Sequence, residues 1–233
     1  MPRILLLVPM SQGASQAQLR SLDMSEGDLQ VVARAVAGAW SSTGTLHDAM
    51  LEDLAVFGAG VVSPEEGFDA VCVHSLSEGG ATALRSVLDV PVLQTARTGF
   101  LQALTLGLRV GALVESAADA VRLHVALRQW GLDRQCSGVR VVAEDLPSRK
   151  EGAQRCVDVD GAEVLCVFST APQAELEDMA VHAGCPVVNP AAVTCRMAAT
   201  FIATGLTHGR VAAPPPIVPK LAVLQAMAHA GQP

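Results

Sequence analysis

Residues 70–80 read AVCVHSLSEGG, and residues 164–172 repeat the first half of this stretch as VLCVFSTAP. In both stretches an apolar run contains a cysteine and reaches a serine three residues after it, at Ser75 and Ser169. A short apolar run bounded by turn signals is typical of a fully buried strand of a parallel sheet. Open α/β sheets bind ligands just beyond the carboxyl ends of such strands. The two matched serines therefore predict a ligand site.

The order of elements around these two stretches is repeated. Three apolar runs of the first half match three of the second half: 3–9 with 109–115, 69–75 with 163–169, and 90–96 with 185–191. Helical patterns separate the runs, and alternation of strands with helices predicts βαβ units and parallel sheets. We therefore expect an α/β fold with two similar lobes. Each lobe has a parallel four-stranded sheet, a pseudo-two-fold axis relates the lobes, and the active site lies in the cleft between them.

The expected first lobe comprises residues 1–96 together with 192–233, and the second lobe comprises residues 97–191. A helix is predicted over roughly 25–40, because Leu29, Val32 and Ala33 can share one helical face after Ser25 as N-cap. A strand is predicted over 139–147.

Composition excludes several classes of protein. A net charge of −7 argues against nucleic acid or an anionic membrane surface as partner. No apolar run is long enough to span a membrane. The six cysteines show neither CxxC nor Cys/His ligand spacing, so we expect reduced thiols, no metal site and a cytoplasmic location. Phosphate-loop, dinucleotide, zinc and serine-hydrolase motifs are missing. A small-molecule substrate is the expected partner, and a homo-oligomer is possible.

The sequence resembles the aspartate/glutamate/hydantoin racemase superfamily, and within it the hydantoin racemase-like branch, over nearly its whole length. The stretches that carry the resemblance are 65–75, 89–96, 129–140, 160–169 and 184–192. The resemblance implies a two-lobe fold in which one catalytic cysteine from each lobe flanks the substrate carbon. One thiolate removes a proton, the opposite thiol returns one on the other face, and no cofactor is needed.

The sequence departs from the family pattern at both catalytic positions. Ser75 and Ser169 stand where the family has its cysteines, and residues 8–11 (VPMS) replace most of an Asn-Pro-Asn-Thr loop. A thiol can be tuned to a thiolate at neutral pH, whereas a serine hydroxyl needs an adjacent base. Cys72 and Cys166 lie about 10 Å back along their strands and do not replace the lost thiols. Ordinary two-thiol racemisation is therefore not expected.

The candidate catalytic residues are Ser75, Ser169, Glu115 and His74. Glu115 ends a predicted strand, and His74 adjoins Ser75, so either can supply acid or base chemistry. Adjacent strand residues face opposite sides, however, and His74 can point away from Ser75. The candidate substrate contacts are Ser11, Gln12, Leu76, Ser77, Glu78, Thr170 and Asn189.

Structural roles compete with these assignments. Serine is a good helix N-cap, so both serines can cap the helices that follow them. Glu78 and Glu115 can be first-turn acids that a helix dipole stabilises. Asn189 can belong to a turn before Pro190.

The sequence favours a cofactor-independent enzyme that acts on a small carbonyl or carboxylate compound by proton transfer, as an isomerase or racemase does. A decarboxylase, another C–C lyase or a cyclase on the same scaffold is an alternative. A catalytically silent small-molecule-binding protein is the alternative from a different class.

Overall fold

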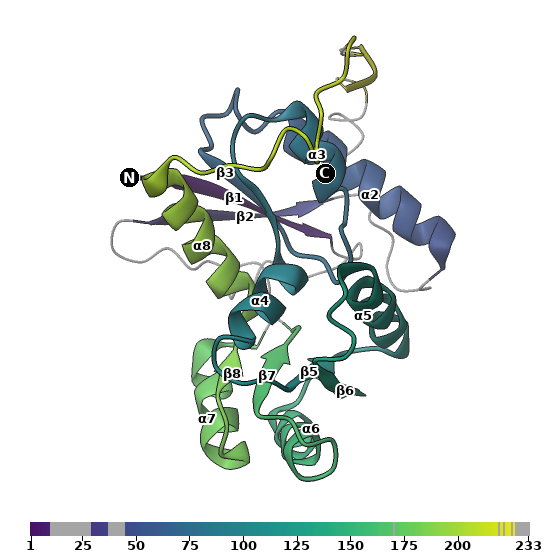
Figure 1. The fold of residues 1–233 in the computed structure, drawn as a ribbon, viewed down its shortest axis with the longest axis vertical. Coiled ribbons are helices and arrows are strands. Elements are labelled where there is room, and N and C mark those ends of the chain that lie inside the picture. The colour runs from purple at the N-terminus through teal and green to yellow at the C-terminus, as the bar shows by residue number, and fades with distance from the viewer. Residues whose placement is uncertain are drawn as a thin grey trace. The chain divides into compact units, whose positions relative to one another are not determined.

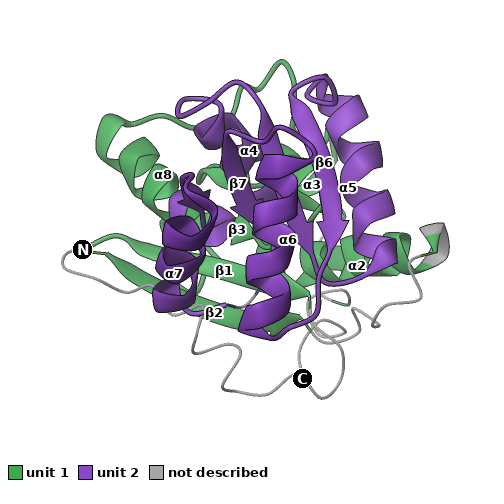
Figure 2. Ribbon diagram, turned by 90° about the horizontal axis from the view of Figure 1, so that it is seen from below, with its two compact units in different colours: residues 1–94, 194–233 green, residues 95–193 purple. Residues whose placement is uncertain are grey.

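The computed structural model describes residues 1–9, 29–36, 45–169, 171–218, 220, 222–224 and 226. By their internal contacts the residues form two compact units, shown in green and purple in Figure 2. Unit 1 comprises residues 1–94 and 194–233, and unit 2 comprises residues 95–193. Each unit contains a four-stranded sheet in which all neighbouring strands are parallel. The predicted α/β class with two parallel four-stranded sheets is confirmed.

The sheet of unit 1 has the strand order β2-β1-β3-β4. Its strands are β1 (Arg3–Pro9), β2 (Gln30–Val36), β3 (Ala70–Val73) and β4 (Val92–Gln94). One face packs on helices α2 (Leu46–Val61) and α3 (Ala81–Val87) (Figure 1). This core contains Leu5, Leu7, Val71, Val73 and residues of both helices, so the odd-numbered residues of β1 and β3 point toward α2 and α3.

The even-numbered residues of β3 point to the other face of that sheet. Cys72 is fully buried there, and its Sγ lies 3.9 Å from the carbonyl oxygen of Thr194 in α8 (Pro190–Thr204). Cys195 and Ala198 of the same helix are also fully buried. Both faces of β3 are therefore covered, as expected for a strand without polar alternation.

The sheet of unit 2 has the equivalent order, β6-β5-β7-β8. Its strands are β5 (Val110–Val114), β6 (Cys136–Val141), β7 (Val164–Val167) and β8 (Val187–Val188). Helices α6 (Leu146–Asp158) and α7 (Gln173–Ala183) form a core with Leu113, Leu165 and Val167. The unit also contains α4 (Thr95–Ala103) and α5 (Ala117–Trp130).

The strand registers make individual residues of the two units comparable. Leu7 pairs with Val73 in unit 1, and Leu113 pairs with Val167 in unit 2. Each pair is the last of its parallel ladder, so the residues that follow also correspond. Ser75 and Ser169 are therefore equivalent, and Phe168 is equivalent to His74.

The helix predicted over 25–40 is wrong for the residues that the structure describes. Residues 30–36 form β2, which pairs with β1 from Arg3↔Gln30 to Pro9↔Val36. The segment QVVARAV is rich in valine, whose branched side chain favours strands. The apolar residues of this short segment also have a helical spacing, but pairing with the central strand β1 determines its conformation.

Several predicted strands are shorter than expected because helix starts lie inside them. β6 covers 136–141 rather than 139–147, since Asp145 caps α6 by accepting a 2.8 Å hydrogen bond from the Ser148 N–H. The strands predicted over 90–96 and 185–191 shrink to β4 and β8. The polar residues at these strand ends thus begin helices, which places them at the carboxyl edges of the sheets.

Candidate functional site at the strand ends

Ser75 follows β3 and is almost buried, with 8% of its surface exposed. Its Oγ accepts a 3.3 Å hydrogen bond from the backbone N–H of Ser77 and lies 3.3 Å from Oε1 of Glu52, to which it donates. The side-chain amide of Gln94 donates to the carbonyl oxygen of Ser75. Contacts from α2, from β4 and from its own turn therefore fix the position of this serine.

Glu52 is the residue of this site that sequence reasoning missed. It lies on α2 with only 8% of its surface exposed, in line with the buried Val56 and Ala59. A carboxylate on the core-facing stripe of a helix is costly unless it is hydrogen-bonded. The signal was present in the sequence, because Glu52 precedes Val56 by four residues and Ala59 by seven, which is the spacing of one helical face.

The turn after Ser75 packs tightly against it. Gly79 has a φ of +52°, and a Cβ there would lie 2.7 Å from Cβ and 2.8 Å from Oγ of Ser75. Gly80 has a φ of +76°, and a Cβ there would lie 2.6 Å from the carbonyl oxygen of Asp53 in α2. Only glycine allows the backbone to approach Ser75 and α2 so closely.

Ser169 of unit 2 adopts the same local turn as Ser75. Its Oγ accepts a 3.2 Å hydrogen bond from the backbone N–H of Ala171, two residues later. Ser169 is half-buried. A hydroxyl that binds the N–H two residues on is a common turn device, so part of the matched placement of the two serines is structural.

Glu115 directly follows β5 and belongs to a charged cluster at that edge of the sheet. Its Oε1 lies 3.5 Å from Nη2 of Arg149, whose Nη1 lies 2.8 Å from Oε2 of Glu175. Burial and the nearby Glu144 carboxylate raise the pKa of Glu115, and Arg149 opposes that rise. Arg149 is 5% exposed and links β5, α6 and α7. Glu115 is thus held in an ion pair.

His74 continues the sheet, because its backbone N–H donates a 2.8 Å hydrogen bond to the carbonyl oxygen of Leu7. Burial lowers the pKa of His74 to about 4, so its ring is neutral near pH 7. Within the described part of the chain, its enclosed Nδ1 has no hydrogen-bond partner.

The remaining predicted substrate contacts separate into three groups. Ser77 joins Ser75, with their Oγ atoms 3.5 Å apart, and Leu76 lies half-buried between them in sequence. Glu78 instead accepts hydrogen bonds from Arg85 at 2.9 Å and from Thr82 at 3.0 Å. Ser11, Gln12 and Thr170 lie outside the described residues.

Asn189 has a structural role at the start of α8. Its Oδ1 accepts hydrogen bonds from the backbone N–H groups of Ala191 at 3.1 Å and Ala192 at 3.2 Å. These are the bonds of a helix N-cap. The side-chain oxygen of Asn189 is therefore committed to the helix.

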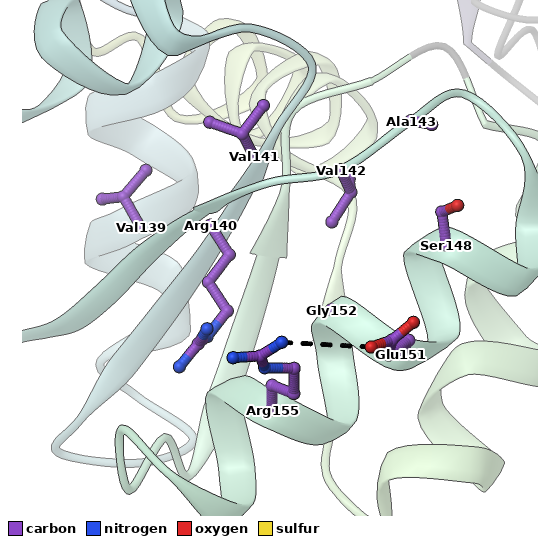
Figure 3. Close-up of a pocket in the computed structure, with 9 residues that line it drawn as sticks. All are labelled: Val139, Arg140, Val141, Val142, Ala143, Ser148, Glu151, Gly152 and Arg155. Carbon is purple, nitrogen blue, oxygen red and sulfur yellow. Dashed lines mark ion pairs between the residues drawn. The ribbon is translucent and has the colours of Figure 1, made fainter.

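A cavity of about 460 Å³ lies elsewhere in unit 2, between β6 and α6 (Figure 3). Its charged lining groups have partners: Arg140 pairs with Asp160 at 2.7 Å, and Arg155 lies 4.0 Å from Glu151. None of the predicted site residues lines this cavity. Across the described ranges, no cluster of histidine, cysteine or acidic side chains could hold a metal ion. No helix in those ranges is both long and apolar enough to cross a membrane.

Solved structures show which known fold this arrangement resembles. Allantoin racemase from Klebsiella pneumoniae matches 96% of this chain and 99% of its own, with 17% identity and a TM-score of 0.80. Allantoin racemase from Pseudomonas fluorescens matches 94% of this chain and 98% of its own, with 19% identity and a TM-score of 0.79. Unliganded arylmalonate decarboxylase matches 88% of this chain and 94% of its own, with 18% identity and a TM-score of 0.62.

These similarities show that the chain has the two-lobe α/β fold of these allantoin racemases and of arylmalonate decarboxylase. No protein-family model matches the sequence, and neither does any curated protein. At identities below one fifth, the likeness is one of fold, and the chemistry has to be argued from this chain's own residues.

Proposed function

We propose that this protein is a cofactor-independent enzyme that transfers a proton at a carbon next to a carbonyl or carboxylate group of a small molecule, as isomerases and racemases do. In this proposal Ser75 and Ser169 occupy the positions of the superfamily's catalytic cysteines. Ser77 and the backbone around Ser75 bind the carbonyl or carboxylate oxygen of the substrate.

One observation carries the proposal. A buried carboxylate, Glu52, lies within hydrogen-bonding distance of Ser75, at the strand end where the sequence predicts the site. A serine needs an adjacent base to take part in acid–base or nucleophilic chemistry. The 3.3 Å separation is long for a hydroxyl–carboxylate hydrogen bond, and such contacts commonly tighten only when substrate binds.

Decarboxylation is the second candidate reaction, because the fold is also that of arylmalonate decarboxylase. Loss of CO2 produces the same kind of carbanion as proton removal, and the enzyme then only has to deliver one proton. A lyase or cyclase reaction would use the same carbanion. The non-catalytic alternative, a small-molecule-binding protein, predicts binding without turnover.

Proton exchange in D2O, followed by NMR, tests the proposal. The full-length protein is incubated with hydantoins, amino acids, malonates and 2-substituted carbonyl acids, beside the double variant Ser75→Ala, Ser169→Ala. We expect deuterium uptake, or CO2 release from a malonate, that falls at least about 100-fold in the double variant, as is usual when acid–base groups are removed. Absence of exchange and of CO2 release across the whole panel would favour the binding protein.

A further inference from the structure

We propose that the outer edge of strand β6 and the adjoining side of helix α6 form a docking surface for a second copy of this chain, in which the two β6 strands pair antiparallel across a two-fold axis. The surface belongs to unit 2 alone and does not depend on the proposed reaction. It borders the cavity between β6 and α6 (Figure 3).

Strand β6 is an edge of its sheet with one open side. In the part of the chain that the structure describes, no strand pairs with β6 on the side away from β5. The N–H of Val142, just after β6, donates to the carbonyl oxygen of Val114 in β5 at 2.9 Å. Successive strand residues direct their backbone groups to opposite sides, so Val139 and Val141 direct theirs away from β5. With six residues, against two in β8 at the other edge, β6 offers a template for a further strand.

Helix α6 leaves this edge accessible. The helix packs closely on the end of the strand, because a Cβ on Gly152 would lie 2.4 Å from Cγ1 of Val142. The cavity of about 460 Å³ is lined by Val139, Val141 and Ala143 as well as by α6, so the outward-facing residues of β6 border free space. Val141 is 50% exposed. A strand edge beside a groove is the arrangement to which an added strand binds.

The charges on α6 favour a second copy as the source of the added strand. Glu151 and Arg155 line the same groove, and their side chains are 74% and 59% exposed and 4.0 Å apart (Figure 3). A two-fold axis sets α6 antiparallel to its copy, so Glu151 of each copy faces Arg155 of the other. The surface is therefore complementary to itself. A purely acidic or purely basic peptide would meet one repulsive charge.

The sequence of β6 favours one register for the pairing. A two-fold axis through Val141 places this residue opposite its own copy, and the two valines exchange both backbone hydrogen bonds. Their half-exposed side chains then lie on the same face and cover each other. Arg140 comes to lie opposite Val142 of the second copy. An axis through Arg140 would instead oppose two guanidinium groups, and an axis through Val139 would leave Val141 opposite the polar Ser137.

Sedimentation velocity of the full-length protein tests the surface. We expect a concentration-dependent dimer that weakens as the salt concentration rises, because exposed ion pairs are screened. Val141→Pro removes an N–H that β5 does not use, and an edge strand tolerates proline at such a position. The variant should raise the dimer dissociation constant about tenfold or more, since two hydrogen bonds between the copies are lost, while circular dichroism stays unchanged. A monomer at all concentrations, or a dimer that Val141→Pro does not weaken, would overturn the proposal.

Charge reversal on α6 tests whether the partner is a second copy. Arg155→Glu and Glu151→Arg should each weaken the dimer about tenfold, because like charges then face each other across the axis. A mixture of the two variants should form a heterodimer that is tighter than either homodimer. Arg128→Glu, which reverses an exposed arginine of α5, is the matched control and should dimerise like the unaltered protein. No gain in the mixture, or an equal loss in the control, would contradict the proposal.

Amide hydrogen exchange, followed by NMR, identifies the strand edge directly. The N–H groups of Val139 and Val141 should exchange at least about tenfold more slowly in the dimer than in dilute, monomeric Arg155→Glu, because hydrogen bonds between the copies protect them. The N–H groups of Arg140 and Val142 face β5 and should be protected in both states, which provides an internal control. Exchange at Val139 and Val141 that does not depend on association would show that this edge is not the contact, and the proposal would fail.

Discussion

The two serine-bearing strand ends have the same backbone turn but different charges beside it. In both units the serine accepts the N–H of the residue two positions later, at 3.3 Å for Ser75 and 3.2 Å for Ser169. In unit 1 a buried carboxylate from α2 contacts the serine. In unit 2 the equivalent helix is α6. Its buried Arg149 takes the position on the apolar face of α6 that Glu52 takes on α2.

The helical spacing establishes this equivalence. Glu52 lies four residues before the buried Val56, and Arg149 lies four residues before the buried Ala153. The next buried core residue follows three positions later in both helices, at 59 and at 156. The two units thus have the same serine turn at the strand end but opposite charges at the equivalent buried helical position.

The largest expected effect concerns the guanidinium of unit 2. Arg149→Met should lower the free energy of unfolding by about 3 kcal/mol, because it leaves the carboxylates of Glu115 and Glu175 without their shared partner in a partly buried site. Urea denaturation measures the change. Lys150→Met, which breaks the more exposed pair with Asp178, should cost less than about 1 kcal/mol. Equal costs would show that Arg149 is no more important than a surface cation.

The turn over Ser75 provides the next test. Gly79→Ala should cost about 2 kcal/mol, since a left-handed backbone costs a non-glycine residue about 1–2 kcal/mol and the new methyl group would also meet Ser75. Gly131→Ala, at a φ of +70° with nothing within 4 Å, isolates the backbone strain. Thermal unfolding of both variants gives the comparison. If the two variants lost the same stability, the close packing on Ser75 would be refuted.

The smallest effect concerns His74 and its equivalent in unit 2, Phe168, whose ring stacks on Phe100. Burial lowers the pKa of His74 from 6.5 to about 4, so the unfolded chain binds the proton more readily in this range. This component of stability is therefore fully present well above pH 6.5 and is lost as the pH falls toward 4, by about 0.7 kcal/mol between pH 7 and pH 6. His74→Phe should remove this component of the acid sensitivity. Urea titrations at several pH values measure it, and an unchanged pH slope would argue against a buried, neutral histidine.

The strands at the centres of the two sheets could be predicted because their sequences allow few alternatives. The runs that became β3 and β7 are short, wholly apolar and bounded by turn residues. β2 could not be predicted in the same way, because Leu29, Val32 and Ala33 fit a helix as well as a strand. Its conformation depends on pairing with β1, a contact that local sequence does not contain.

The sequence predicted candidate residues at the strand ends, and these stay predictions; it did not predict which side chains contact them. The repeat singled out Ser75 and Ser169, yet Asn189 caps a helix, and Glu78 pairs with Arg85 of α3, the helix that begins three residues after it. Glu52 was overlooked because its contact with Ser75 joins residues 23 positions apart through the packing of α2 on the sheet. A polar residue on an otherwise apolar helical stripe is the kind of signal that would have found it.

The burial of Cys72 and Cys166 has a consequence for the behaviour of the chain under oxidising conditions. Burial raises the pKa of the Cys166 thiol, and a hydrogen bond between the Cys72 and Cys195 thiols together with burial raises that of Cys72, so neither thiol forms a reactive thiolate readily. A serine hydroxyl cannot be oxidised to a sulfenic or sulfinic acid. Strand ends that carry serine hydroxyls are therefore expected to be insensitive to peroxide and to thiol-blocking reagents. Whatever reaction these strand ends support, it should persist under treatments that inactivate a cysteine-dependent enzyme of the same fold.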